Sequence, residues 1–438
     1  MADTNGMQAR CESEKSWVAL AETVGPRSPV LKALLKRFST PQAVLTADET
    51  ALREVWPEVG NGTLLALKNG AVEREADRIV SWCSRNGVRI LTPADGDFPA
   101  CLREIDEPPA VLYCRGKLPD MDKRLTVGII GTRRPDAYGE QVTYKLSFEL
   151  AAAGAVIVSG LAEGLDGLAA AGALNAGGET VAVLGCGIDM VYPRQHTRLR
   201  DEILQHGAVV TEFSPGTPPN GWNFPIRNRI ISALSKGVTV VEAGERSGTL
   251  ITARYALLQG KALFAVPGDI TSPRSVGTNR LLADGALPAL GTEQMLSHFR
   301  FLYRETLQLK ELPPLAPCAE LNPQALRRFG LSMQEAYRPA EPVKKRTKRR
   351  KNDKTAETVS KNAETATESA MQTERPPADL SVLTPRQREL YALLPEGPFS
   401  VDVLLSHSVP VAEAVGSLTV FEIYGLLSSC PGGMFEKK

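Results

Sequence analysis

The sequence predicts an α/β protein whose core is a doubly wound parallel sheet, and two patterns beyond Leu125 carry that prediction. One is a series of short, continuously apolar runs, and the other is a helical apolar pattern after each run. Continuously apolar strands are typical of sheets buried on both faces, and alternation with helices is typical of parallel strands. We therefore expect a Rossmann-like core over residues 88–311. The runs are LTVGII, AVIVSG, ETVAVLG, GAVVTE, GVTVVEA and ALFAVPG.

Residues 16–87, which precede this core, show helical apolar spacing broken by short turns, as in SWVALAETVG and VLKALLKRFST. This pattern predicts a small helical domain. Turn residues within STPQAVLTADETALREV fit a helix-hairpin-helix or SAM-like arrangement, a type that often contacts DNA backbones. A helical cap that serves only as a scaffold fits the same residues, so both interpretations stand.

The chain after the core divides into a polar segment and a final small domain. Residues 312–377 lack the apolar surface needed to repay the entropy of ordering, so we expect a disordered linker. Its basic run, residues 344–354, suits either phosphate attraction or a solubilising role. Residues 378–438 combine short helical patterns with a glycine turn near the end, which is the plan of a winged helix.

Composition limits the possible partners and compartment. The 438 residues suffice for about three folded units. With 51 basic and 50 acidic residues the net charge is +1, so nucleic-acid binding must come from a local patch. Seven cysteines are scattered without a CxxC pair, which argues against a zinc ribbon or a disulfide framework. We expect a cytoplasmic protein without metal or cofactor, and without a membrane segment of ~20 apolar residues.

Candidate ligand-binding residues lie in the loops that follow the predicted strands, because ligands of open α/β sheets bind at the carboxyl ends of the strands. The loop GTRRP combines a permissive glycine, a hydroxyl and a guanidinium suited to phosphate. The loop SGLAEGLDG has two glycines that would let an anion approach backbone N–H groups. The residues expected to face an anion in these two loops are Gly131, Thr132, Arg133, Gly160 and Gly164.

A second group of candidates lies in NFPIRNRII and GERSGTLITA, at the starts of two helical patterns. Arginines and SGT donors here would line one edge of the sheet with phosphate-compatible groups. Phe224 suits stacking on an unpaired base, worth ~1 to 3 kcal/mol, or a hydrophobic contact with its own helix. The arginines alternatively form ion pairs with Glu242 or Glu245. The candidates are Phe224, Arg227, Asn228, Arg229, Ser247, Gly248 and Thr249.

Nucleotide-enzyme signatures are weak in this sequence. GCGIDM has no third glycine at the required place and no GxxxxGK[ST] loop occurs, which excludes a nicotinamide dehydrogenase and a P-loop ATPase. The four histidines suit surface or packing roles better than that of a base. Asp166 and Glu242 suit ribose or helix-capping acceptors. No complete catalytic constellation emerges, so we expect no enzyme.

These motifs occur in an order that resembles the bacterial DNA-processing protein A family, also called Smf. The resemblance covers the chain from about Ser16 to the end of the core and resumes in LTPRQRELYALLPEG and PGGMF. It implies a protein that binds incoming single-stranded DNA in natural transformation, protects it and helps load a RecA-type recombinase. It also implies a homodimer built through the Rossmann-like domain. The family's Gly-Ser/Thr-Arg, Phe-Pro-x-Arg-Asn-Arg and Ser-Gly-Ser/Thr segments fall on the candidates named above.

Two departures from the family pattern leave other functions open. Ala170 stands where the family usually has a histidine, and the linker is unusually long and basic. The tail lacks a dense row of cations, which favours a protein contact over DNA binding there. The alternatives are a Rossmann-like nucleoside-phosphate hydrolase and a scaffold whose outer domains make the contacts.

Overall fold

The computed structural model describes residues 2–303, 305–307, 326–331, 383, 385–400, 402–407, 409, 417–418, 420–422, 426–430 and 434–437. The chain forms two compact units, residues 1–344 and 345–438, which are described separately. The expected linker lies outside the described residues except for 326–331, and its basic run lies wholly outside them.

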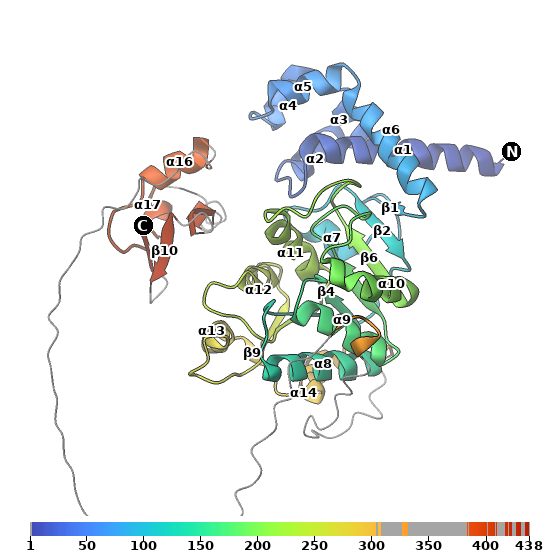
Figure 1. The fold of residues 1–438 in the computed structure, drawn as a ribbon. Helices are drawn as coiled ribbons and strands as arrows, with labels where there is room; N and C mark the ends of the chain where they lie inside the picture. The colour runs from blue at the N-terminus through green and yellow to red at the C-terminus, as the bar shows by residue number, and fades with distance from the viewer. Residues whose placement is uncertain are drawn as a thin grey trace, which may run out of the picture. The chain divides into compact units, whose positions relative to one another are not determined.

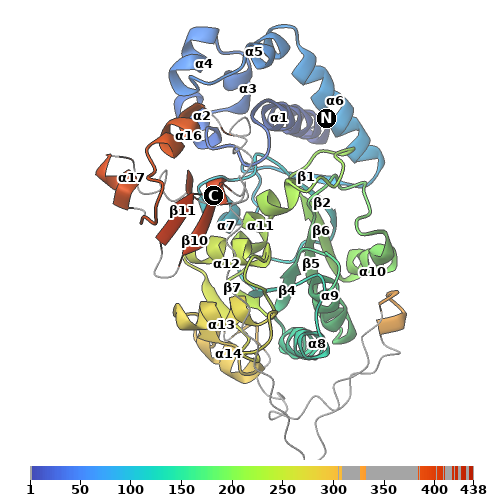
Figure 2. The same ribbon diagram turned by 60° about the vertical axis from the view of Figure 1, so that its left-hand side comes forward.

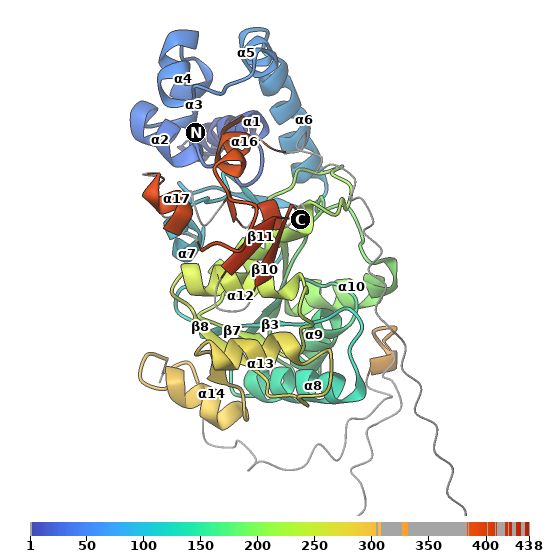
Figure 3. The ribbon, with the colours of Figure 1, turned by 90° about the vertical axis from the view of Figure 1, so that its left-hand side faces the viewer.

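The first unit begins with helices that are grouped at one end of the sheet (Figures 1 and 3). Thr40 and Asp48 cap two of them by accepting hydrogen bonds from Ala43 N–H and Ala51 N–H, at 3.2 and 2.9 Å. The first helix starts well before the expected boundary at residue 16, in a polar stretch without an apolar stripe to reveal it. The helices are α1 (Ala2–Val24), α2 (Leu31–Phe38), α3 (Pro41–Leu45), α4 (Glu49–Val55), α5 (Asn61–Lys68) and α6 (Ala71–Arg85).

A nine-stranded, mostly parallel sheet follows, in the order β1-β2-β6-β5-β4-β3-β7-β8-β9. The α/β prediction is confirmed, and every predicted apolar run contains a strand. The strands are β1 (Arg89–Leu91), β2 (Leu112–Gly116), β3 (Thr126–Ile130), β4 (Val156–Ser159), β5 (Thr180–Val183), β6 (Gly207–Thr211), β7 (Gly237–Val240), β8 (Ala262–Ala265) and β9 (Leu287–Pro288).

Helices cover both faces of this sheet, as Figure 2 shows. Val127 and Ile157 pack with α8, α9 and α10 on one face, whereas Val158 and Val238 pack with α7, α11 and α12 on the other. Burial on both sides explains why the strands read as continuous apolar runs. The helices are α7 (Ala100–Glu104), α8 (Ala137–Ala152), α9 (Leu165–Asn175), α10 (Thr197–His206), α11 (Asn223–Ala233), α12 (Thr249–Leu258), α13 (Val276–Ala283) and α14 (Thr292–Phe299).

The chain reverses its direction across the sheet at β3. It passes from β3 through β4 and β5 to β6, then returns to place β7 on the other side of β3. The loops after β3 and β7 therefore diverge, and such a reversal opens a crevice at the carboxyl ends of the strands.

Three strands at the margins of the sheet were not predicted from the sequence. β1 pairs antiparallel with β2, and β2 pairs antiparallel with β6. β9 has two residues and contains Pro288, which is tolerated at a sheet edge. Strands this short, or open to solvent at one end, do not produce a continuous apolar run.

The second unit contains α16 (Pro385–Ala392), α17 (Asp402–Ser406) and a hairpin of β10 (Leu427–Cys430) and β11 (Met434–Lys437). Phe399 forms an isolated bridge with Phe435 of the hairpin. Leu390, Leu404 and Phe421 are buried in its own small core.

Helix α11 is anchored by a charge pair buried beneath it. The Arg229 guanidinium donates two hydrogen bonds of 2.6 Å to the two oxygens of Glu212, and Nε donates to Glu107 O at 3.0 Å. The Arg229 side chain is 1% exposed and that of Glu212 3%. Arg27 binds Glu107 at 2.6 Å, so the α1–α2 turn joins the same network. A buried pair of this kind is costly to break from one side only.

The Arg229→Met variant should lose about 3–5 kcal/mol of unfolding free energy, because Glu212 would remain buried without a partner. The double variant Arg229→Met, Glu212→Leu should recover most of that loss, since no charge is left behind. Denaturant unfolding of the wild type, both single variants and the double variant measures the coupling. A loss below about 1 kcal/mol for Arg229→Met would contradict the anchoring role.

Candidate nucleic-acid interface

A pocket of about 670 Å³ lies at the carboxyl edge of the sheet, where the strand order reverses. Its wall combines the loop after β3, the start of α11 and the turn before α12. Three loops far apart in the sequence are thus brought together, as expected from the strand topology. The predicted residues that line it are Gly131, Thr132, Arg133, Phe224, Arg227, Asn228, Ser247, Gly248 and Thr249.

Arg133 lies at the mouth of this pocket over an aromatic ring. Its guanidinium carbon is 5.2 Å from the centroid of the Phe224 ring, and its side chain is exposed. No carboxylate of the described residues lies within 4 Å of it. A guanidinium over an aromatic face keeps its charge and its donors available to an anion.

Phe224, the second residue of α11, is half-buried and held by several contacts. Tyr192 lies 5.5 Å from it between ring centroids, at an interplanar angle of 37°. A Cβ on Gly185 would come within 2.8 Å of the ring, so glycine there is needed for the close approach. The ring is therefore fixed by packing with Tyr192 and Gly185 in the pocket wall.

Arg227 forms the pocket floor with Asp166. Its Nη1 donates to Gly160 O at 2.7 Å and to Val183 O, and Nε donates to Asn228 Oδ1 at 3.2 Å. Burial lowers the pKa of Arg227 to about 10, against the attraction of Asp166. Burial raises the pKa of Asp166, against the attraction of Arg227. Arg227 is thus largely committed to protein carbonyls.

Gly160 and Gly164 do not line the pocket, and their lack of a side chain serves packing instead. A Cβ on Gly160 would lie 2.6 Å from both Arg227 Nη1 and Asp166 Oδ2. Gly164 has a φ of +77°, and its Cβ would lie 2.6 Å from Thr132 O. The expectation that these glycines admit an anion is not supported by their placement. They hold the floor and the Arg133 loop in position.

Arg229 also lies away from the pocket, which corrects the expectation that it faces an anion. The segment from Asn223 is already helical, so residues 227 and 229 point about 200° apart around α11. The predicted alternative, an intramolecular ion pair, describes Arg229 correctly. Its partner is Glu212 rather than Glu242 or Glu245.

The Ser-Gly-Thr turn closes the pocket at the start of α12. Ser247 Oγ accepts from Thr249 N–H at 3.3 Å and donates to Thr249 Oγ1 at 3.0 Å. Asn228 Nδ2 lies 3.5 Å from Gly248 O and joins this turn to α11. The N-terminus of α12 favours negative charge here through its unpaired N–H groups.

Two further residues belong to this site and a third precedes one of its helices, and none of them was singled out from the sequence. Tyr192 and Arg134 line the pocket, and Tyr192 is 37% exposed. Trp222 is 63% exposed, immediately before α11. Aromatic residues in the loops after predicted strands are the signal that could have found Tyr192 and Trp222.

The titratable residues do not assemble a metal site in the part of the chain that the structure describes. His196 is buried, with Nδ1 3.0 Å from Leu161 O, in agreement with its predicted packing role. Among the described helices, none is long and apolar enough to span a membrane.

Glu242 is buried beneath the Arg133 loop. Its carboxylate accepts from Asp136 N–H at 3.3 Å, and Asp136 caps α8 by accepting from Gly139 N–H at 3.0 Å. A Cβ on Gly139 would lie 2.4 Å from the Glu242 carboxyl carbon. Burial, together with Asp136, raises the pKa of Glu242 to about 8. Glu242 is therefore mainly protonated at neutral pH, and both acids support the start of α8.

Glu242→Gln should make the protein's stability less dependent on pH. The raised pKa means that Glu242 favours folding while protonated, and this contribution falls as pH rises from the unfolded value of about 4.3 to about 8. The difference in unfolding free energy, Glu242→Gln minus wild type, should rise by at least about 1 kcal/mol from pH 5 to pH 8.5. Thermal unfolding across this range tests it, with exposed Glu245→Gln as the matched control. Parallel pH profiles for wild type and Glu242→Gln would contradict it.

The sequence matches known proteins along most of its length. A family model described as DNA recombination-mediator protein A matches residues 89–300. DNA processing protein DprA of Bacillus subtilis is 42% identical over 224 residues, which cover 50% of this chain and 75% of that protein. Protein Smf of Synechocystis is 30% identical over 428 residues, which cover 96% and 98%.

Two solved structures are also similar to this chain. The structure of DNA processing protein A from Streptococcus pneumoniae matches with a TM-score of 0.55 and 31% identity, covering 65% of this chain and 97% of that one. A structure of the Helicobacter pylori protein, which concerns its single-stranded DNA binding mode, matches with a TM-score of 0.44 and 35% identity, covering 48% and 95%. The chain belongs to the DprA/Smf family of DNA-processing recombination mediators.

Proposed function

We propose that this protein binds single-stranded DNA through the pocket at the strand reversal. The observation that carries the proposal is the layer of exposed Arg133 over Phe224 at the pocket mouth. A cation beside an aromatic ring suits a phosphate and a neighbouring unstacked base, with little preference for sequence. The sequence relationship to the Helicobacter pylori protein makes a single strand the first ligand to test.

The finer function that we propose is protection of incoming DNA during natural transformation and loading of a RecA-type recombinase onto it, in the cytoplasm. Membership of a family of recombination mediators supports this proposal. The pocket supports it because a contact with backbone and base faces tolerates any sequence, as DNA taken up from outside requires.

The alternative function is hydrolysis of a nucleoside phosphate. Asp166 and Arg227 converge on the pocket floor, which is a feature of such enzymes. Arg227 is largely bonded to carbonyl oxygens, however, and Asp166 accepts hydrogen bonds from the backbone at Ala162 and Gly160. Both side chains therefore have structural partners, which favours the binding function. A screen of nucleoside mono- and diphosphates for hydrolysis tests the alternative.

We also propose roles for the outer parts of the chain. Residues 16–87 form a helical domain of the helix-hairpin-helix or SAM-like type, and residues 378–438 form a winged-helix-like domain that contacts protein. The helix pair and hairpin of the second unit support the latter.

Deleting residues 378–438 should leave the affinity for single-stranded DNA within about twofold of the wild-type value, because the described residues of this segment have no dense row of cations.

Arg133→Ala should weaken binding of single-stranded DNA about tenfold, because the variant removes both a cation that neutralises one phosphate and the charge over Phe224. The measurement is fluorescence anisotropy with a labelled oligonucleotide and its duplex at low and moderate salt. The wild type should prefer the single strand, with affinity that falls as salt rises.

The matched control is Arg300→Ala, an exposed arginine after α14. Its neighbour Phe299 packs against Gly237 at the amino end of β7, opposite the pocket edge. It should bind like the wild type. Equal binding by the wild type and Arg133→Ala would place the site elsewhere.

Recombinase loading is then tested by strand exchange on DNA coated with single-strand-binding protein. The wild type should stimulate strand exchange, and Arg133→Ala should not.

We propose that two copies associate through the core, at a face that includes the last turn of α12. Leu257 and Leu258 are 60% and 68% exposed there, and adjacent exposed leucines indicate a contact surface. Replacing both by Glu should convert a dimer into a monomer in sedimentation velocity. A wild type that remains monomeric at micromolar concentration would overturn the proposal, and a variant that remains dimeric would move the contact elsewhere.

A further inference from the structure

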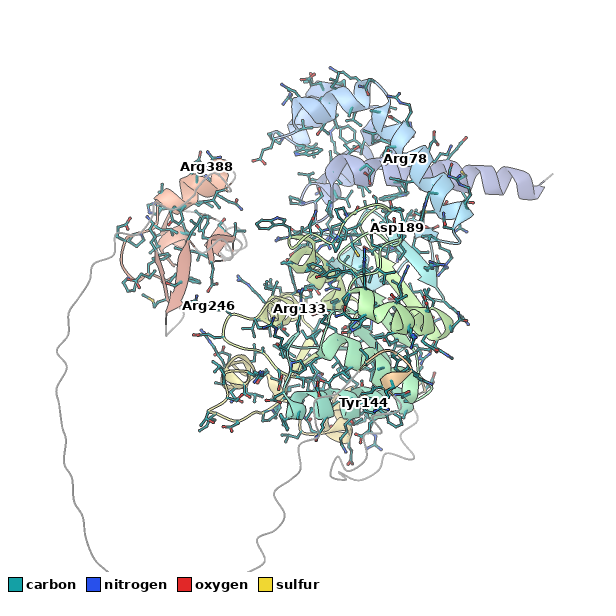
Figure 4. All side chains as sticks on the ribbon, in the orientation of Figure 1. Arg78, Arg133, Tyr144, Asp189, Arg246 and Arg388 are labelled. Carbon is teal, nitrogen blue, oxygen red and sulfur yellow. The ribbon has the colours of Figure 1, made fainter. Side chains whose placement is uncertain are left out.

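A second group of arginines lies beyond the pocket, along the same edge of the sheet. Arg134 follows β3, Arg246 follows β7 and Arg274 follows β8, and these strands are neighbours in the order β3-β7-β8. All three side chains are exposed. Figure 4 labels Arg133 and Arg246, which belong to the loops after β3 and β7. Parallel strands bring these loops to one edge, although the residues are far apart in the sequence.

Hydrogen bonds join the three loops into one surface. Arg274 Nε donates to Arg134 O at 3.0 Å, which joins the third loop to the first. Ala243 N–H donates to Arg274 O at 3.0 Å, and Gly277 N–H donates to Ala243 O at 2.8 Å, which join the third to the second. These hydrogen bonds hold the three loops together, so this surface is formed before any ligand arrives.

This surface carries net positive charge, and its guanidinium groups are exposed to a ligand. Within the described chain, no carboxylate lies within 4 Å of the guanidinium nitrogens of Arg134, Arg246 or Arg274. The nearby acid Glu242 is buried, and its raised pKa leaves it mainly uncharged at neutral pH. Exposed Asp269 accepts hydrogen bonds from Thr271 N–H and Oγ1 within its own turn. Half-buried Asp136, which caps α8, interacts electrostatically with Arg274, and Glu245 is exposed, so two acids stand against three arginines.

The part of the pocket wall that follows β5, on the other side of the strand reversal, is different in character. Exposed Tyr192, which follows β5, presents an aromatic ring there. A bound polyanion is expected to leave the pocket toward the arginines, because phosphates release counterions when they contact Arg side chains.

We propose that a single strand held in the pocket continues across these loops, and that its phosphates contact Arg246 and Arg274 as a second, sequence-independent binding segment. This inference rests on the proposed function of the pocket. Arg134 lines the pocket and lies between the two segments. The second segment should add affinity only for strands long enough to extend beyond the pocket.

The test is a length series of oligothymidylates, measured by anisotropy with the wild type, Arg133→Ala, Arg246→Ala and the double variant Arg246→Ala, Arg274→Ala. The double variant should bind the shortest measurable oligonucleotide like the wild type and bind long ones about tenfold more weakly at moderate salt. Its salt slope on long strands should fall by about 1.4, or about 0.7 for each phosphate that the variant no longer neutralises.

Arg300→Ala is the control for loss of charge alone, and thermal unfolding checks each variant's fold. Arg246→Ala keeps the test decisive if Arg274→Ala disturbs its loop, because no hydrogen bond or ion pair among the described residues depends on the Arg246 side chain. A double variant with the wild-type length dependence and salt slope would overturn this inference while leaving the pocket intact. A wild type that binds no single strand would overturn both the inference and the proposed function.

Discussion

The buried pair of Arg229 and Glu212 fixes helix α11, and the candidate interface depends on the position of that helix. Arg229 occupies the protein-facing side of α11, whereas Phe224 and Arg227 occupy the pocket side. The Arg229 guanidinium bonds Glu212 and Glu107 O at once, so rotation of the helix would break these hydrogen bonds. Because Arg27 joins the network through Glu107, the N-terminal helices are coupled to the same helix.

Glycines at this edge of the sheet let charged groups approach closely. Gly160 leaves room for Arg227 and Asp166 to meet, and Gly139 leaves room for Glu242 beneath α8. In each case a Cβ would come within 3 Å of a side chain that the site needs. These glycines therefore shape the candidate interface from beneath, while the exposed arginines above them supply positive charge.

The sequence predicted the strands and the pocket loops well because both follow from short-range patterns. Continuous apolar runs mark strands buried on both faces, and parallel topology brings their loops together. The roles of Arg229 and Gly160 were not predictable in this way, since they depend on which side of α11 faces the pocket. The start of that helix at Asn223 decides this, and no capping side chain marks it.

The edge strands and two exposed aromatic residues were missed for another reason. β1 and β9 are too short to produce a periodic signal, and Tyr192 and Trp222 lie in loops where an exposed aromatic residue has no fixed spacing. Arg246 adjoins the predicted SGT turn, yet its relation to Arg274 follows only from the pairing of β7 with β8. Such relations require the three-dimensional arrangement of the loops.

Photo-crosslinking tests the location of the interface most directly. A single-stranded oligonucleotide containing 4-thiothymidine would be irradiated with the full-length protein, and the crosslinked peptides would be identified by mass spectrometry. We expect crosslinks to the peptides that contain Phe224 and Tyr192, and their disappearance in Arg133→Ala at the same DNA concentration. Crosslinks confined to residues 2–85 or 383–437 would contradict a nucleic-acid interface at the strand reversal.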